Sequence, residues 1–199
     1  MSFRKEKKYR LFRSDMAKIK MDLISLGMQE LHPSRQVNSC YFDTSELILY
    51  YESEEGVLPR KKIRIRWYDD VAKFNKEIKI SSLEGRFKKT EVAGSLLTVN
   101  DLHRTICFDK DYGSLSPVLQ VRYVREYFFY KSLRITFDSD ISYEFLRSAT
   151  NASRRDPECV MEVKVPIDCD DSYVEGLINF PTSRFSKYSR GLLFFDGML

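Results

Sequence analysis

Five short segments of the chain alternate charged with apolar residues, and their charged side chains are of the types that bind phosphate and divalent metal. The charged sets are Arg4-Glu6-Lys8, Lys62-Arg64-Arg66, Glu77-Lys79, Arg134-Thr136-Asp138 and Glu162-Lys164. Because side chains alternate between the two faces of a β-strand, each set is predicted to stand on one face of its strand. Lysine and arginine bind phosphate, and carboxylate oxygens suit Mg²⁺ or Mn²⁺. The pattern therefore indicates a site for a polyanion and its divalent metal.

The opposite faces of these segments are apolar and need burial, as Ile63-Ile65-Trp67 and Met161-Val163-Val165 illustrate. Period-two patterns and turn residues predict strands over residues 3–11, 39–43, 60–68, 74–81, 86–92, 117–130, 132–138 and 159–166. Helical spacing and caps predict helices over residues 14–26, 98–107, 171–179 and 183–193, with Ser14 capping the first and Gly27 ending it. Residues 45–52 fit a strand or a helix.

About eight strands with few helices predict an α+β fold with an antiparallel sheet. Turns at Asp69-Asp70 and Glu84-Gly85 predict a meander, and the junction at residues 130–132 predicts a hairpin. We expect the sheet to close into an eight-stranded antiparallel β-barrel with flanking helices and a C-terminal helix, because such a barrel would place the charged faces in a bore that holds one narrow ligand. The 199 residues, 43% of them hydrophobic, predict a single domain spanning residues 1–199.

Composition excludes several classes of function. The net charge of +4 is too small to indicate a nucleic-acid coat or a polybasic membrane surface. Four widely spaced cysteines and two isolated histidines argue against a zinc site and a disulfide framework, and predict a reducing, cytoplasmic location. No run approaches the ~18 apolar residues of a membrane span, so any membrane association would need a partner protein encoded elsewhere. A P-loop motif is also absent from the sequence.

Each charged pattern also has a structural interpretation. A basic strand face can be an exposed, solubilising surface, and a carboxylate beside a lysine can be a plain ion pair. The second interpretation is slightly favoured for Glu77, whereas a metal ligand is favoured for Glu162. Basic residues 184, 187 and 190 would share one face of the last helix, which either gates the mouth of a bore or is solvated. The aromatic residues between 123 and 130 are predicted to be core.

The chain resembles the VTC (vacuolar transporter chaperone) polyphosphate polymerase domain, a branch of the triphosphate tunnel metalloenzymes in the CYTH-like superfamily. The similar segments lie in order between residues 4 and about 191 and are Arg4-x-Glu6-x-Lys8-Tyr9, Ser39-x-Tyr41-Phe42-Asp43-Thr44, Lys62-x-Arg64-x-Arg66-x-Tyr68, Glu77-Ile78-Lys79, Lys88-Lys89, Tyr123-x-Arg125, Arg134-x-Thr136-x-Asp138, Glu162-Val163-Lys164 and Phe185-Ser186-Lys187-Tyr188. Each motif alone is weak, but nine in order form a specific pattern.

The resemblance implies a metal-dependent enzyme that transfers the γ-phosphate of ATP to a growing polyphosphate chain and releases ADP. Site residues follow from it together with the strand pattern: catalytic Arg64, Arg66, Lys79 and Arg125; phosphate-binding Arg4, Lys8, Lys62, Lys88, Arg134, Lys164 and Lys187; and Glu162 and Glu6 for Mn²⁺ or Mg²⁺. Lys88 is preferred to Lys89 because it is two residues from Arg86 and is therefore expected on the same face of the strand. Arg4 replaces the first glutamate of the E-x-E-x-K motif, which favours the polymerase branch over the hydrolytic branch.

Three other functions are considered. The same side chains could hydrolyse inorganic triphosphate or a nucleoside triphosphate, or they could bind polyphosphate or nucleotide as a non-catalytic sensor. A nucleic-acid-binding barrel is a weaker hypothesis, because it needs exposed aromatic rings. The expected ligands are therefore ATP or another nucleoside triphosphate and inorganic polyphosphate, without nucleic acid. The compact chain is most similar to the free-standing bacterial form of the family, and a membrane partner protein would be separate.

Overall fold

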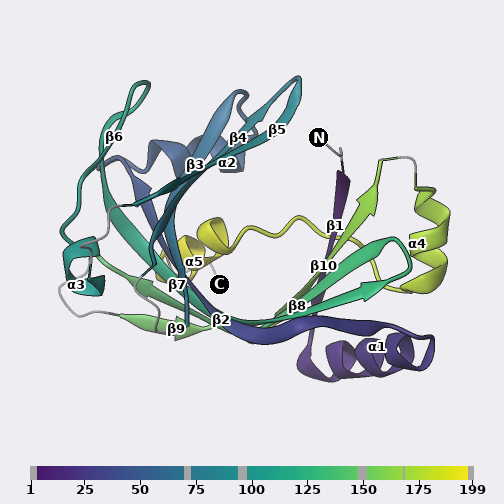
Figure 1. The fold of residues 1–199 in the computed structure, drawn as a ribbon. Helices are drawn as coiled ribbons and strands as arrows, with labels where there is room; N and C mark the ends of the chain where they lie inside the picture. The colour runs from purple at the N-terminus through teal and green to yellow at the C-terminus, as the bar shows by residue number, and fades with distance from the viewer. Residues whose placement is uncertain (1–3, 70–72, 94–97, 148–151, 168, 197–199) are drawn as a thin grey trace. The chain divides into compact units, whose positions relative to one another are not determined.

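A computed structural model describes residues 4–69, 73–93, 98–147, 152–167 and 169–196 (Figure 1). Its strands are β1 (Arg4–Leu11), β2 (Gln29–Asp43), β3 (Arg60–Tyr68), β4 (Asn75–Ser82), β5 (Gly85–Val92), β6 (Cys107–Asp109), β7 (Gly113–Tyr130), β8 (Leu133–Phe145), β9 (Ser153–Arg155) and β10 (Cys159–Pro166). Its helices are α1 (Arg13–Ser25), α2 (Ile48–Glu55), α3 (Val99–Leu102), α4 (Asp171–Leu177) and α5 (Lys187–Phe195). None of the helices in these ranges is long and apolar enough to cross a bilayer.

The strands form a hydrogen-bonded sheet in the order β1-β10-β8-β7-β2-β3-β4-β5, and β6 and β9 pair with β7 and β8. Strands β1 and β10, β10 and β8, and β2 to β5 pair antiparallel. The predicted antiparallel sheet with few helices, including a C-terminal helix, is therefore confirmed.

The predicted closed eight-stranded barrel is wrong. The path of pairings starts at β1 and stops at β5, and no pairing between these two strands closes it within the described part of the chain. Strand β5 is exposed at every position after Gly85 and carries Arg86, Lys88 and Lys89. Charged side chains along an exposed strand disfavour pairing with a further strand, so β5 remains an edge.

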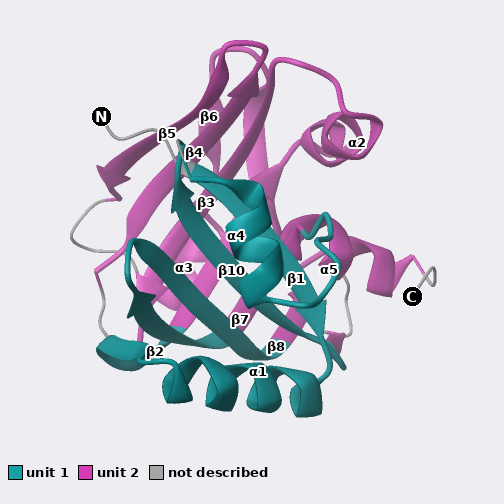
Figure 2. Cartoon of the chain, turned by 90° about the vertical axis from the view of Figure 1, so that its right-hand side faces the viewer, with its two compact units in different colours: residues 1–36, 123–141, 155–185 teal, residues 37–122, 142–154, 186–199 magenta. Residues whose placement is uncertain are grey.

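The chain divides into two compact units (Figure 2). Unit 1 contains residues 1–36, 123–141 and 155–185, and unit 2 contains residues 37–122, 142–154 and 186–199. Strands β2, β7 and β8 each contribute residues to both units. The single domain over residues 1–199 stays a prediction.

Unit 1 buries the apolar faces of β1, β8 and β10 under two helices. Ile135, Phe137, Met161 and Val163 are fully buried with Tyr9. Met16, Ile19 and Leu23 of α1 and Val174 of α4 pack in the same core. Helix α1 begins after extended Phe12, which has no side-chain cap, so the predicted cap by Ser14 is wrong because Ser14 already lies in the first turn. Gly27 has a φ of 99° and ends this helix as predicted.

Unit 2 contains the predicted meander of β3, β4 and β5, with the end of β2 paired to β3. Ile63, Ile65 and Trp67 turn inward and pack with Phe42 and Leu49. The apolar faces that alternate with the basic residues of β3 are therefore buried, as the sequence predicts. The opposite face of the same strands carries the charged side chains, and its residues are placed by the register of the ladder.

Several element boundaries differ from the prediction. Strand β2 begins at Gln29 rather than at residue 39, and residues 45–52 contain the start of helix α2. The predicted helix over residues 98–107 is the short α3, which begins with a capping box between Thr98 and Asp101. Cys107 already belongs to β6. Helix α5 begins at Lys187 after a Ser186 cap, so Arg184 precedes the helix that was expected to include it.

Candidate functional site

The register of unit 2 aligns its charged residues in two rows across neighbouring strands. One row runs from Tyr41 of β2 through Arg64 of β3 to Glu77 of β4. The adjacent row joins Lys62 of β3, Lys79 of β4 and Lys88 of β5. Arg66 lies beyond the first row, opposite Ser39 and Asn75. The strand pairing thus brings five of the predicted site residues together on one face: Lys62, Arg64, Arg66, Lys79 and Lys88.

Glu77 is the central anion of this face. Arg64 donates to Glu77 Oε2 from Nε at 2.8 Å and from Nη2 at 2.6 Å, and Lys88 Nζ donates to Oε1 at 2.6 Å. Arg66 Nη1 lies 3.8 Å from the same carboxylate. Burial alone would raise the pKa of Glu77, but Arg64 and Arg66 beside it, with the hydrogen bond from Lys88, lower that pKa to about 2. The carboxylate is therefore ionised at neutral pH, and the structural interpretation of Glu77 fits its contacts.

The row of lysines places like charges directly opposite one another on three strands. Lys62 Nζ donates to Ser186 Oγ at 2.7 Å, whereas Lys88 contacts Glu77 and the side chain of Lys79 is exposed. Like charges directly opposite each other destabilise a sheet. Such a row is favourable when an anion lies across it.

The choice of Lys88 over Lys89 agrees with the register. Lys88 is opposite Lys79 and contacts Glu77, so it shares the charged face. Lys89 is opposite Ile78 and forms its ion pair with Glu91 at 2.5 Å. The phosphate-binding role of Lys88 itself stays a prediction.

Two residues of unit 2 that the sequence did not assign to the site are Tyr41 and Asp43. Tyr41 Oη accepts a hydrogen bond from Arg64 Nη1 at 2.9 Å, and its ring stacks on Tyr188 with centroids 4.9 Å apart. Tyr188 Oη donates to Asp43 Oδ2 at 2.5 Å. The S-x-Y-F-D-T segment was the only sequence signal for these residues, and it gave no role to either.

Asp43 connects β2 to two helices of unit 2. Its carboxylate accepts from the backbone N–H groups of Thr44, Leu49 and Tyr50 at 2.8, 2.9 and 3.0 Å, in addition to the Tyr188 hydroxyl. Burial raises the pKa of Asp43, although these hydrogen bonds oppose the rise. The carboxylate thereby fixes the start of α2 and the first turn of α5, which carries Lys187.

Unit 1 presents a second charged face, on β1, β10 and β8. One cross-strand row contains Glu6, Lys164 and Arg134, and the next contains Lys8, Glu162 and Thr136. Lys164 Nζ lies 3.6 Å from Glu6 Oε1 and 3.4 Å from Glu162 Oε1, so it bridges the two predicted metal ligands. Lys8 Nζ donates to the carbonyl of Phe185 at 3.0 Å. The side chain of Arg4 lies outside the described part of the structure.

Arg125 is engaged in a buried ion pair of unit 1. It donates from Nε to Asp138 Oδ1 at 2.6 Å and from Nη2 to Oδ2 at 2.7 Å. Burial would lower the pKa of Arg125, but Asp138, with Tyr123 and Glu162, raises it well above the ordinary value. The fork geometry holds this guanidinium in one orientation. Arg125 therefore belongs to unit 1, whereas the other predicted catalytic residues, Arg64, Arg66 and Lys79, belong to unit 2.

The residues of unit 1 fit a divalent metal only in part. No group of three or more His, Cys, Asp or Glu side chains that could hold a metal ion occurs among the described residues. Glu6 and Glu162 supply two hard carboxylates, and Thr136, opposite Glu162, has a buried hydroxyl with no hydrogen-bond partner in the described structure. Mg²⁺ is typically held by one or two carboxylates with substrate phosphates as further ligands. The donor set fits a metal that arrives with a phosphate ligand.

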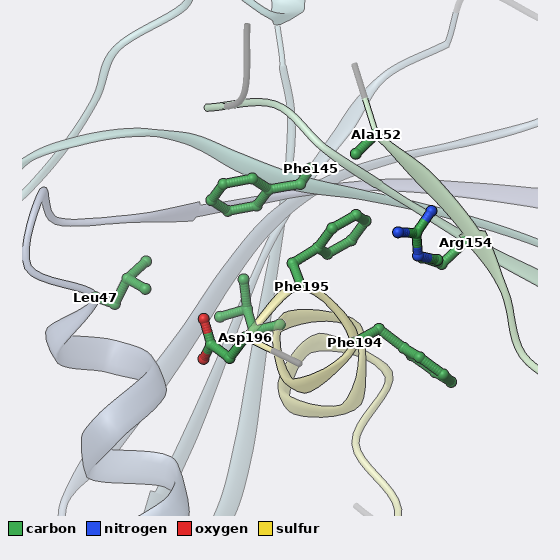
Figure 3. A pocket seen from close by; sticks show the side chains of 8 residues that line it. Leu47, Phe145, Ala152, Arg154, Phe194, Phe195 and Asp196 are labelled. Atoms are coloured by element: carbon green, nitrogen blue, oxygen red, sulfur yellow. The ribbon is translucent and has the colours of Figure 1, made fainter. Parts of the chain in front are cut away.

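A pocket in unit 2 has a different chemical character (Figure 3). Its lining consists of Leu47, Phe145, Ala152, Arg154, Leu192, Phe194, Phe195 and Asp196. None of the predicted phosphate-binding residues is among them. A mostly apolar lining with a single arginine does not suit a polyphosphate, so this pocket is not assigned to the charged site.

Comparison with solved structures supports the fold. A protein from Pyrococcus horikoshii is 12% identical and superposes with a TM-score of 0.59, with 94% of this chain and 98% of that chain covered. A protein from Hippeastrum, described as an adenylyl cyclase candidate with a dominant triphosphatase activity, is 18% identical, with a TM-score of 0.56 and coverage of 98% and 96%. An adenylate cyclase candidate from Vibrio parahaemolyticus is 15% identical, with a TM-score of 0.54 and coverage of 96% and 98%.

The sequence comparisons give one match. No curated protein matches this chain. The family model described as the VTC domain matches residues 3–195, which is nearly the whole sequence. The match includes all nine segments on which the resemblance was based.

Proposed function

The chain belongs to the VTC domain family, and from this premise we propose that it is an enzyme of triphosphate chemistry that transfers the γ-phosphate of ATP to a growing polyphosphate chain. Each unit is given its own role: the cations of unit 2 bind phosphate, and the carboxylates of unit 1, taken by themselves, can hold a divalent metal. Nucleic acid is not among the proposed ligands. A cytoplasmic location and a separate membrane partner stay predictions.

The observation that carries the proposal is the row of Lys62, Lys79 and Lys88 beside Arg64 and Arg66. Five cations stand on three neighbouring strands with Glu77 as the carboxylate among them. Cations two residues apart on one strand are about 6.6 Å apart, which is wider than the spacing of successive phosphates in a chain. Cations on the adjacent strands can fill these gaps, so that together they contact successive phosphates of one chain. Phosphoryl transfer depends mainly on positioning and charge stabilisation, which such a cluster provides without a nucleophilic side chain.

The metal assignment rests on the carboxylates of unit 1. Glu162 and Glu6 would hold Mn²⁺ or Mg²⁺, with the Thr136 hydroxyl as a further oxygen donor. The metal would neutralise charge on the phosphate oxygens. Lys164, which bridges the two carboxylates, has a partly exposed side chain and can move aside when a divalent metal ion takes the place of its ammonium group. Arg125 would stay paired with Asp138 and orient the neighbouring Glu162 through its positive charge.

Hydrolysis of a triphosphate is the second candidate function. It is favoured by the likeness in fold to the Hippeastrum protein, whose description names a triphosphatase activity. The same cations and carboxylates would then activate attack by water rather than by a terminal phosphate. Arg4, in place of a third carboxylate, favours transfer over hydrolysis.

The test separates transfer from hydrolysis in one reaction. The purified protein is incubated with ATP and either Mn²⁺ or Mg²⁺, and the products are resolved on a gel that separates phosphate chains by length. Chains that lengthen with time, with ADP in equal amount to the phosphate added, would support the polymerase. Orthophosphate in equal amount to ADP, without chains, would establish hydrolysis and overturn polymerisation. Tight polyphosphate binding without turnover would instead indicate a sensor.

A further inference from the structure

Tyr41 occupies an unusual position for a tyrosine hydroxyl, among cations rather than beside a hydrogen-bond acceptor. Its side chain is 6% exposed, and its Oη accepts from Arg64 Nη1 at 2.9 Å. The Arg64 guanidinium lies 5.7 Å from the centre of the Tyr41 ring. A hydroxyl that accepts from a guanidinium, in a setting with few anions, has the environment that stabilises a phenolate.

The charged and titratable groups that face Tyr41 come from three neighbouring elements. Strand β3 presents Arg64 and Arg66, and helix α5 presents Lys187 and the Tyr188 ring that stacks on Tyr41. On β4, Glu77 is the nearest carboxylate in the same row, but it is already bound by Arg64 and Lys88. On β2 itself, Asp43 accepts the Tyr188 hydroxyl and three backbone N–H groups.

These surroundings shift the ionisation of Tyr41. Burial would raise the pKa of Tyr41, but the charges of Arg64, Arg66 and Lys187 and the hydrogen bond from Arg64 lower it to about 7. The neighbouring Tyr188 shifts the other way, because burial and the Asp43 carboxylate raise its pKa well above the ordinary value. Two stacked tyrosines therefore have opposite preferences, and only Tyr41 loses its proton near neutral pH.

We propose that Tyr41 is a phosphate-linked proton acceptor: its phenolate balances the cations of unit 2 while no phosphate is bound, and it takes up one proton from solvent when a triphosphate binds. This inference rests on the proposed function. Phosphate oxygens would share Arg64, Arg66 and Lys187 and bring negative charge close to the phenolate. Two anions near the same cations repel each other, so the phenolate becomes the neutral phenol and then donates its O–H to a phosphate oxygen.

The first measurement needs no ligand. Ionisation of tyrosine is followed by ultraviolet absorbance near about 295 nm during a pH titration of the wild type, Tyr41→Phe and Tyr50→Phe. Tyr50→Phe is the matched control, since Tyr50 is buried in the same unit and its pKa is raised rather than lowered. We expect one tyrosine to ionise near pH 7 in the wild type and in Tyr50→Phe but not in Tyr41→Phe. Absence of this ionisation in the wild type overturns the proposal.

The second measurement is calorimetric titration with inorganic triphosphate at about pH 8, in two buffers of different ionisation enthalpy. There most of the free Tyr41 is expected to be ionised, so the wild type should take up more protons per triphosphate than Tyr41→Phe, by up to about one. The triphosphate itself can also gain or lose protons on binding, and this contribution cancels when the proton uptake of Tyr41→Phe is subtracted from that of the wild type. Triphosphate binding with equal proton uptake in both overturns the role of Tyr41 and leaves the proposed function intact. Failure of the wild type to bind triphosphate overturns both.

Loss of folding is not expected to obscure these results. Tyr41→Phe keeps the ring that stacks on Tyr188 and removes only the hydroxyl. Circular dichroism of the variant checks that it is folded. A variant that is folded and binds triphosphate with wild-type proton uptake is the clearest result against the proposal.

Discussion

The two charged faces use the same pattern of alternating residues but differ in their balance of charge. Among the site residues named for unit 2, six cations stand against two carboxylates: Lys62, Arg64, Arg66, Lys79, Lys88 and Lys187 against Glu77 and Asp43. The described side chains of unit 1 are nearly balanced, with Lys8, Arg125, Arg134 and Lys164 against Glu6, Asp138 and Glu162. The excess in unit 2 suits a bound anion, whereas the balance in unit 1 suits carboxylates that exchange a lysine for a metal.

Burial sharpens this difference. Asp138 of unit 1 is 1% exposed and accepts hydrogen bonds from both arms of the Arg125 fork, so the two side chains form a buried bidentate ion pair. Glu77 of unit 2 is also buried, but it is shared among three cations, each of which keeps donors for another partner. The comparison indicates that a carboxylate can organise several phosphate-binding cations without cancelling their charge.

Arg64→Ala should have the largest effect on function. The variant removes the cation that joins Tyr41 to Glu77, and we expect kcat/KM for ATP to fall about 10³-fold, the range found when a preorganised donor of developing charge is lost. Arg122→Ala is the matched control, since Arg122 belongs to the same unit and is exposed, with Glu144 as its ion-pair partner. Wild-type kcat/KM in Arg64→Ala would show that the excess charge of unit 2 does not serve the reaction.

Glu77→Gln should have the largest effect on stability. It leaves Arg64 and Arg66 without their carboxylate, so we expect the free energy of unfolding to fall by about 3 kcal/mol at pH 7. Because the pKa of Glu77 is lowered to about 2, its contribution is complete above the unfolded pKa of about 4.5 and is lost as pH falls towards 2. Chemical denaturation of both proteins from pH 7 to 2 measures this convergence.

The control for this substitution is Glu91→Gln, an exposed carboxylate on β5 that pairs with Lys89. Exposed pairs contribute little to stability, so its denaturation midpoint should match the wild type at every pH. A Glu77→Gln variant as stable as the wild type would mean that the cations of unit 2 do not need a central anion, which contradicts the comparison.

Much of each charged face could be predicted from the sequence. The strict alternation of Lys62-Ile63-Arg64-Ile65-Arg66 allows only one assignment to faces, and the short turn at Gly85 fixes the parity of Lys88 against Glu77. The start of β2 could not be predicted in the same way. Residues 29–36 are mostly exposed and include Pro33, so no face of this segment has a hydrophobic pattern.

Closure of the sheet could not be predicted from strand patterns, because alternation is a property of each strand and closure depends on whether the edges pair. The roles of Tyr41 and Asp43 were also hidden. Both depend on Tyr188, 145 residues beyond Asp43 in the chain, and only the folded structure shows this contact. Local sequence therefore gave the polar faces of the strands, while contacts between distant segments had to come from the structure.

Glu162→Gln tests the assignment of metal to unit 1. The variant removes one charged ligand, so we expect activity at fixed Mn²⁺ to fall about 10²-fold and to recover in part at higher metal concentration. Binding of triphosphate without metal should change less than about threefold, because the cations of unit 2 are intact. The control is Glu175→Gln, an exposed carboxylate of α4 that pairs with Lys7. An unchanged metal dependence in Glu162→Gln would remove the distinction between the two faces.

The smallest effect is expected from the pair Lys88→Ala and Lys89→Ala. The two lysines are adjacent on β5, and both are exposed, but Lys88 lies on the face of Glu77 and Lys79 whereas Lys89 lies opposite Ile78. Lys88→Ala should weaken binding of inorganic triphosphate about tenfold and reduce its dependence on salt, because one phosphate contact of about 1.4 kcal/mol is lost. Lys89→Ala should bind as the wild type in the same fluorescence or calorimetric titration. Equal weakening by both substitutions would mean that triphosphate responds to the net charge of β5 rather than to the face that its register selects.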